Sequence, residues 1–296
     1  MVKASIVILT WNSQEVIDGC LSSLAQGITS HPFEVIVIDN DSSDQTLSII
    51  QQRYSWVRLV RNQVNRGVAP ARNQGMRMAR GEYIVILDDD TVVHPGALDC
   101  LLLYMENHRE VGLCGPQLTN SEGRCHLSCR LFPTLSYKLV RRLPFRFARR
   151  MTRAVEMADW DHATIRDVDY MIGACQTIRK AALAEVGLFD EHIFYGPEDV
   201  DLCLRLQKAG WRVVYNPEAI VMHRERRVTR SLFSFLGYKH TWGLLYYFWK
   251  HHYWFSRRRL YAQLPTRQVS LHTRDLPPVR TPAFVLETPV LPESEQ

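Results

Sequence analysis

Two acidic segments of this sequence have the residue types and the spacing that chemistry on phosphates requires. Asp88-Asp89-Asp90 directly follows the apolar run at 83–87. In an extended segment, residues i and i+2 face the same side, so Asp88 and Asp90 point into one site and Asp89 points elsewhere. Carboxylates in a loop are ligands for Mg²⁺ or Mn²⁺, and phosphate oxygens complete the shell. The alternative is an acidic turn after an edge strand, and the buried strand that precedes these residues disfavours it.

The second acidic segment, Glu198-Asp199-Val200-Asp201, opens a predicted helix over 198–209 that is entered through Pro197. The positive end of a helix favours an ionised carboxylate, which a general base needs in order to accept a proton from a hydroxyl group. Asp199 is therefore a candidate base. The alternative is that these carboxylates only satisfy the first turn of the helix, and helix physics alone does not separate the two hypotheses.

An alternation of strands and helices over residues 1–116 must position the first of these acids. The sequence predicts strands over 5–10, 33–39, 57–60 and 83–88, and helices after Asn12 and Ser13, from Ser42 to Ile50 and from Pro70 to Gly81. This order predicts an α/β fold with a doubly wound, mostly parallel, Rossmann-like sheet. Ligands of such sheets bind beyond the carboxyl ends of the strands, where Asp39 and Asp88 lie. Because neither G-x-G-x-x-G nor G-x-x-x-x-G-K-[ST] occurs, a metal held by carboxylates is the simplest means of neutralising bound phosphates.

The second half of the chain predicts a smaller region and then a C-terminal extension. Its expected elements are a basic insertion over 124–163, a strand region over 168–178, helices over 180–186 and 198–209, a strand over 212–222 and an aromatic helix within 231–255. The expected organisation is one domain over 1–225 with halves 1–116 and 117–225, a basic, aromatic, helical extension over 226–262, and a poorly ordered tail over 263–296.

The net charge of +5 conceals two basic stretches in an acidic body. Residues 124–153 sum to +9, residues 224–259 to +8 and the other 230 residues to −12. This distribution needs an anionic partner or surface. A hydrophobic fraction of 46% excludes a wholly disordered chain, and no apolar run reaches the roughly 18 residues that span a membrane. With no export signal at the N-terminus, the seven cysteines are expected to be reduced thiols of a cytoplasmic protein.

Aromatic residues interleave with basic ones in both of these stretches. Residues 231–255 contain eleven aromatics flanked by arginines, a composition that is favoured at the surface of an anionic leaflet. Leu139, Leu143, Phe147 and Met151 are spaced by four and predict a helical stripe in the insertion. We therefore expect a peripheral protein at the inner face of the cell membrane; the alternative is that the stripes pack into the core. Single-stranded nucleic acid also binds such sequences, but no recognition motif supports it, so no nucleic-acid partner is expected.

Ordered motifs over residues 3–225 resemble those of family 2 glycosyltransferases, most closely the rhamnosyltransferase-like branch of bacterial surface polysaccharide synthesis. The motifs are Ser5-Ile-Val-Ile-Leu-Thr-Trp-Asn12, Val37-Ile-Asp39-Asn40-Asp-Ser-Ser-Asp44, Asn65-Arg-Gly67-Val-Ala-Pro-Ala-Arg72-Asn73-Gln-Gly75, Leu87-Asp88-Asp89-Asp90, and Gly187-Leu-Phe-Asp190 followed by Glu198-Asp199-Val-Asp201. The resemblance implies a GT-A fold and an inverting transfer from a UDP- or dTDP-type sugar to a hydroxyl of a saccharide acceptor that is lipid-linked. It also implies Mg²⁺ or Mn²⁺ as cofactor. Transfer to a polyprenyl phosphate and a non-catalytic role in binding nucleotide sugars are the alternatives.

The resemblance also implies roles for individual residues. Asp199 corresponds to the catalytic base and Asp39 to the acid that contacts the nucleobase. The other positions on the nucleotide-sugar side are Thr10, Asn12, Asn65, Arg72, Asp88 and Asp89. Asp90 and His223 correspond to metal ligands, and Gly173, Glu198 and Trp242 are expected on the acceptor side.

Overall fold

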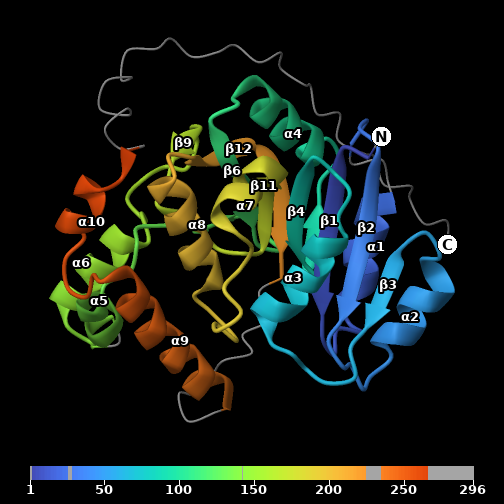
Figure 1. Ribbon diagram of the computed structural model, residues 1–296, viewed down its shortest axis with the longest axis horizontal. Helices are drawn as coiled ribbons and strands as arrows, with labels where there is room; N and C mark the ends of the chain where they lie inside the picture. Colours follow the sequence, from blue (N-terminus) through green and yellow to red (C-terminus); the bar gives the residue numbers. More distant parts are fainter. Residues whose placement is uncertain (1, 26–28, 142, 225–234, 266–296) are drawn as a thin grey trace, which may run out of the picture.

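The computed structural model describes residues 2–25, 29–141, 143–224 and 235–265 (Figure 1). Its strands are β1 (Ala4–Thr10), β2 (Phe33–Asp39), β3 (Arg58–Arg61), β4 (Tyr83–Asp88), β5 (Thr91–Val93), β6 (Val111–Thr119), β7 (Cys125–His126), β8 (Cys129–Arg130), β9 (Arg166–Asp167), β10 (Tyr170–Met171), β11 (Cys175–Arg179) and β12 (Arg212–His223). Its helices are α1 (Ile17–Ala25), α2 (Thr46–Arg53), α3 (Val68–Met78), α4 (Ala97–Asn107), α5 (Leu135–Val140), α6 (Arg146–Val155), α7 (Lys180–Val186), α8 (Glu198–Lys208), α9 (Phe235–His251) and α10 (Arg258–Ala262).

The main sheet has the order β3-β2-β1-β4-β11-β6-β12-β5, with β7 paired to β6 and β9 to β12. Strands β3, β2, β1 and β4 are parallel, and β12 is parallel to β6, so the predicted mostly parallel sheet is confirmed. Strand β11 lies antiparallel between β4 and β6, which the sequence did not predict. The predicted strand region 168–178 is divided into β10 and β11, because Gly173 lies in a turn between them.

Helices cover both faces of the sheet (Figure 1). Alternate residues of β1 point to opposite faces: Val7 packs into the core beneath α3, α7 and α8, whereas Ile6 and Ile8 pack beneath α1, α2 and α4. This alternation explains why the strands are continuous apolar runs, since both faces are buried. The carboxyl ends of β1, β2 and β4 therefore form one edge, which carries Thr10, Asp39 and Asp88.

The basic insertion is less helical than its spacing predicts. Helix α5 ends at Val140 and α6 begins at Arg146, because Pro144 lies between them and cannot continue a helix. The prediction that the four apolar residues spaced by four form the face of one helix is therefore wrong. Its members Leu139, Leu143 and Phe147 are 64%, 45% and 69% exposed.

The C-terminal extension is partly core and partly surface, so neither of the two interpretations of its aromatic residues holds for the whole segment. Tyr247 and Phe248 of α9 are fully buried, and Tyr253 joins the same hydrophobic cluster as the sheet. Trp242 and Trp249 on the same helix are exposed. Helices α5, α6, α9 and α10 gather at one end of the molecule, opposite α2 and β3 (Figure 1).

Two predicted segments lie partly outside the described residues. Residues 225–234 at the start of the extension and 266–296 of the predicted tail are not described. Leu264 is described and fully buried, so ordered packing continues past residue 263, where the tail was predicted to start. Within the described ranges, no helix is both long enough and apolar enough to cross a membrane.

Candidate active site

Arg72 of α3 is the residue around which the acidic segments meet. Its side chain is buried, and its Nη2 atom donates hydrogen bonds to Asp88 Oδ1 and, over 3.1 Å, to the carbonyl oxygen of Gly173. Its Nη1 atom lies 3.3 Å from Glu198 Oε1. Arg72 therefore joins the end of β4 to the first residue of α8, so the two acidic segments identified in the sequence belong to one site.

A cluster of potential metal ligands lies beside Arg72. One ligand atom each of Asp88, Asp90 and His223 lies within 4.8 Å of the others, and His223 Nε2 is 3.3 Å from Asp90 Oδ1. Pairing of β12 with β5 places His223 opposite Thr91, next to Asp90. Two carboxylates and an imidazole fit a divalent cation such as Mn²⁺. The side chain of Asp89 points away and accepts a hydrogen bond from Ser13 Oγ.

His126 is a residue of this site that sequence reasoning missed. Its ring stacks on that of His223, with ring centroids 5.6 Å apart and an interplanar angle of 26°. It reaches this position because β7 pairs with β6 in register Leu118↔His126. The sequence offered no signal for this contact, since a single histidine in a basic insertion has no distinctive spacing.

The predicted nucleotide side lies at the carboxyl ends of β1 and β2. Thr10 and Asp39 are adjacent in register and fully buried. Asp39 Oδ2 accepts a hydrogen bond of 3.2 Å from the backbone of Ser42, whereas Asp39 Oδ1 and Thr10 Oγ1 bond to no described residue. Asn12 is exposed and left-handed (φ 50°), and its Oδ1 accepts a hydrogen bond of 2.9 Å from the backbone of Ser43. Buried polar atoms without protein partners are what a bound polar ligand would satisfy.

Asn65 shapes the loop that leads into α3. Its Oδ1 accepts hydrogen bonds from Asn40 Nδ2 (2.9 Å) and from the backbone of Gly67 (3.0 Å). Gly67 has φ +86°, and a Cβ atom there would lie 2.6 Å from the ring of Phe194. Only glycine fits this position, so the Asn65–Gly67 loop fixes where α3, and with it Arg72, begins.

Glu198 and Asp199 have different environments although they are neighbours. Asp199 accepts hydrogen bonds from the backbone amides of Val200 (2.7 Å) and Gly173 (3.2 Å). Burial and the neighbouring charge of Asp199 raise the pKa of Glu198 to about 7, against the opposing charge of Arg72. Burial also raises the pKa of Asp199, while its amide hydrogen bond and the charges of Arg72 and Arg130 oppose the rise. The pair therefore retains a proton more readily than exposed carboxyls do.

Asp201, the third acid of this segment, belongs to the packing of α9 on α8. Its fully buried carboxylate contacts Arg205 Nε (2.8 Å), Lys250 Nζ (2.7 Å) and His251 Nε2 (2.8 Å). Although burial opposes it, these partners hold the pKa of Asp201 well below its ordinary value. Gly243 completes the contact, because a Cβ atom there would lie 2.7 Å from the carbonyl oxygen of Gly196. Trp242, predicted on the acceptor side, lies on α9 and is 59% exposed.

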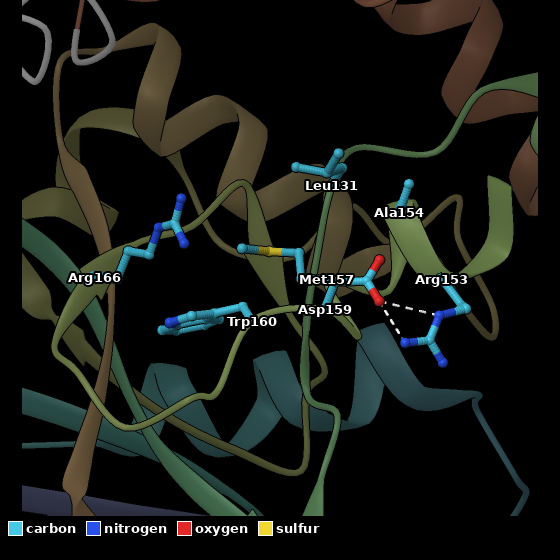
Figure 2. A pocket seen from close by; sticks show the side chains of 7 residues that line it. All are labelled: Leu131, Arg153, Ala154, Met157, Asp159, Trp160 and Arg166. Atoms are coloured by element: carbon cyan, nitrogen blue, oxygen red, sulfur yellow. Dashed lines mark hydrogen bonds and ion pairs between the residues drawn. The ribbon is translucent and has the colours of Figure 1, made fainter. Parts of the chain in front are cut away.

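A separate cavity of about 440 Å³ opens in the insertion (Figure 2). It is lined by Leu131, Arg153, Ala154, Met157, Asp159, Trp160 and Arg166. Figure 2 shows the Arg153–Asp159 ion pair on one side and the flat ring of Trp160 on the other. None of these residues belongs to the predicted site.

Comparison with known proteins assigns this chain to a family. Residues 5–187 match the profile described as Glycosyl transferase family 2. The chain is 31% identical over 261 residues to N-acetylglucosaminyl-diphospho-decaprenol L-rhamnosyltransferase of Mycobacterium tuberculosis, an alignment that covers 80% of this chain and 84% of the relative. It is also 33% identical over 128 residues to poly(ribitol-phosphate) beta-N-acetylglucosaminyltransferase TarP of Staphylococcus aureus, which covers 42% of this chain and 39% of TarP.

Solved structures give the same fold. The S. aureus TarS structure matches with a TM-score of 0.55 at 20% identity, covering 76% of this chain and 37% of that one. GalNAc-T7, crystallised with UDP, GalNAc and Mn²⁺, matches with a TM-score of 0.60 at 16% identity, covering 79% and 46%. This chain thus spans less than half of these two structures. It belongs to glycosyltransferase family 2, has the GT-A fold and is rhamnosyltransferase-like, as its motifs predicted.

We expect the raised pKa of Glu198 to make stability depend on pH. Between the ordinary pKa of 4.5 and about 7, the unfolded state ionises while the folded state keeps its proton, so the wild type loses stability as pH rises through this window. Glu198→Gln removes this titration. Its stability relative to the wild type should therefore increase from pH 5 to pH 8, by on the order of 2 kcal/mol. Melting curves across this range measure the trend. Glu122→Gln, at an exposed glutamate, should show none, and a pH-independent difference for Glu198→Gln would contradict the assignment.

Proposed function

We propose that this protein is an inverting glycosyltransferase that uses a UDP- or dTDP-type sugar and a lipid-linked saccharide acceptor in cell-surface polysaccharide synthesis. The observation that carries the proposal is the junction at Arg72, which joins Asp88 on the donor edge of the sheet to Glu198 and Asp199 at the start of α8. The name of the mycobacterial relative specifies a lipid diphosphate acceptor, and this relative supports the same acceptor class for this chain.

In the proposed reaction, an acceptor hydroxyl oxygen attacks the anomeric carbon of the donor as the bond from that carbon to the diphosphate breaks. The hydroxyl proton passes to Asp199, and the nucleoside diphosphate leaves from the opposite face. Asp199 suits this role because its hydrogen bonds to backbone amides hold the carboxylate in place without a direct ion pair to a described residue. Asp39 and Thr10 would contact the nucleotide.

Asp88, Asp90 and His223 would hold a divalent cation, Mn²⁺ or Mg²⁺, with His126 packed behind His223. When bound, such a cation offsets the negative charge of the leaving diphosphate. The chain offers no Walker lysine or glycine cradle for this purpose.

The same proposal includes contact with the cytoplasmic face of an anionic membrane through a surface that we call the basic apolar end. Nine of the fourteen large apolar side chains that are exposed in the described ranges lie there: Leu139, Leu143, Phe145, Phe147, Tyr238, Trp242, Leu245, Trp249 and Phe255. Exposed arginines accompany them, namely Arg146, Arg149, Arg150, Arg258 and Arg259. Apolar and basic side chains together favour the interface of an anionic bilayer, where each basic residue contributes roughly 1 kcal/mol.

Replacing the proposed base tests the reaction. Asp199→Asn preserves the shape of the side chain and removes the proton acceptor, so transfer should fall by roughly 10²–10⁴-fold while donor binding is retained. Steady-state transfer and calorimetric binding of the nucleoside diphosphate measure the two effects. Asp161→Asn, at an exposed aspartate of the insertion, is the matched control. Transfer by Asp199→Asn within a few-fold of wild type would exclude Asp199 as the base.

Metal dependence is tested at Asp90. Asp90→Asn should weaken Mn²⁺ binding, measured by paramagnetic resonance, by at least about 10-fold because it removes one of three ligands. Transfer by the wild type should stop in excess chelator and return when Mn²⁺ or Mg²⁺ is added. Full activity in chelator would contradict the metal site.

Vesicle binding tests the basic apolar end. The triple variant Phe145→Ser, Phe147→Ser and Trp249→Ser should bind phosphatidylglycerol vesicles at least about 10-fold more weakly, because three exposed apolar side chains lose their burial in lipid. Wild-type binding should also weaken as salt rises toward roughly 0.5 M. Trp56→Ser changes a side chain that is 45% exposed at the opposite end of the molecule and should bind like wild type. Equal binding to neutral and anionic vesicles would contradict the electrostatic contribution.

A further inference from the structure

Arg130 of the basic insertion lies beside the proposed base without a carboxylate of its own. Its Nε atom is buried and bonds to no described residue, and its guanidinium forms no ion pair with a described carboxylate. Its side chain hydrogen-bonds the Tyr170 hydroxyl, which is uncharged. Placing an arginine out of water without a carboxylate partner is unfavourable, so a half-buried arginine of this kind is suited to binding an anion.

Strand pairing positions Arg130 close to the reaction centre. It is in register with Tyr170 in the small β8–β10 sheet, and the backbone of Ile172 donates a hydrogen bond of 3.0 Å to the carbonyl of Ser128. The next residue, Gly173, donates its amide hydrogen bond to Asp199. The charge of Arg130 is close enough to act against the rise in the pKa of Asp199 that burial causes.

The surroundings of Arg130 are aromatic and hydroxylic. Its charge acts on the hydroxyls of Tyr170 and Tyr137, on the carboxylate of Glu156 and on Asp199. Glu156 is itself hydrogen-bonded by the hydroxyl of Tyr137 over 3.4 Å. An anion bound by Arg130 would therefore meet two neighbouring carboxylates, Glu156 and Asp199, and two tyrosine hydroxyls.

The two arginines near Asp199 differ in what they can still bind. Arg72 is occupied by two carboxylates and a carbonyl oxygen, whereas Arg130 comes from the insertion and has none of these partners. The side chain of Arg72 contacts Asp88 at the end of β4, on the donor edge of the sheet. Arg130 approaches from β8 and β10, so its anion belongs to the other substrate.

We propose that Arg130 binds a phosphoryl group of the acceptor, namely the diphosphate that links its sugar to the lipid. This assignment rests on the proposed function, because it requires an acceptor with a diphosphate near the reacting hydroxyl. It gives the basic insertion a role in selecting the acceptor. A neutral glycoside would place no charge against the guanidinium, so it would bind more weakly.

Calorimetric binding of two acceptor analogues tests this assignment. Both carry N-acetylglucosamine, one on a short-chain alkyl diphosphate and the other as a neutral alkyl glycoside. Wild type should bind the diphosphate analogue about 10–100-fold more tightly than the glycoside. Arg130→Gln should lose this preference while its affinity for the glycoside changes less than about three-fold, and Arg130→Lys should keep part of it. Arg124→Gln, at an exposed arginine of the same insertion, should behave like wild type.

Three outcomes would overturn the assignment. In the first, wild type and Arg130→Gln prefer the diphosphate analogue equally. In the second, wild type shows no preference between the two analogues. In the third, Arg130→Gln loses affinity for the nucleoside diphosphate and not for the acceptor analogue. Melting curves establish that each variant is folded, and Arg130→Lys replaces Arg130→Gln if the latter is not. If the preference depends on Arg130 but wild type transfers no sugar to the diphosphate analogue, the proposed function fails while the anion site stands.

Discussion

The buried guanidinium of Arg72 imposes the constraint on which the rest of the site depends. Its two carboxylate partners are Asp88 of β4 and Glu198 of α8. These residues lie 110 positions apart in the sequence. Removing one partner of a buried ion pair leaves an uncompensated charge and costs about 3–5 kcal/mol. Gly173 follows from the same constraint, because a Cβ atom there would lie 2.7 Å from Arg72 Nη1. The approach of the two halves of the site is thus fixed by one side chain.

This arrangement gives two adjacent acids, Glu198 and Asp199, different environments. Burial and the charge of Asp199 raise the pKa of Glu198 against the opposing charge of Arg72, so near neutral pH Glu198 retains its proton more readily than an exposed glutamate. Asp199, at the N-terminus of α8, is fixed by the backbone amides of Val200 and Gly173. It makes no direct ion pair with a described residue. Amide donors stabilise the carboxylate without a directly paired cation that would have to separate when a proton arrives. Adjacent residues of one helical turn can therefore serve as a structural acid and a proton acceptor.

The sequence predicts the parallel half of the sheet well, because local apolar runs and helix periodicity determine it. Thr10, Asp39 and Asp88 follow from that half, since strand ends share one edge. The antiparallel position of β11 between β4 and β6 and the contact between His126 and His223 were not predictable in this way, because both depend on pairing between distant segments. The break between α5 and α6 had a visible signal in Pro144, which the spacing argument overlooked.

Composition alone could not divide the aromatic residues of α9 between core and surface, because both environments favour them. The structure places Phe248 inside and its neighbour Trp249 outside. The buried side of this helix contacts the segment 196–201 through Gly243 against Gly196 and through Lys250 against Asp201. The exposed side belongs to the basic apolar end. If that end lies on a bilayer, as we propose, one rigid helix sets the distance between the membrane surface and Asp199. A lipid-linked acceptor, which is confined to the same surface, would then meet the base at a fixed depth.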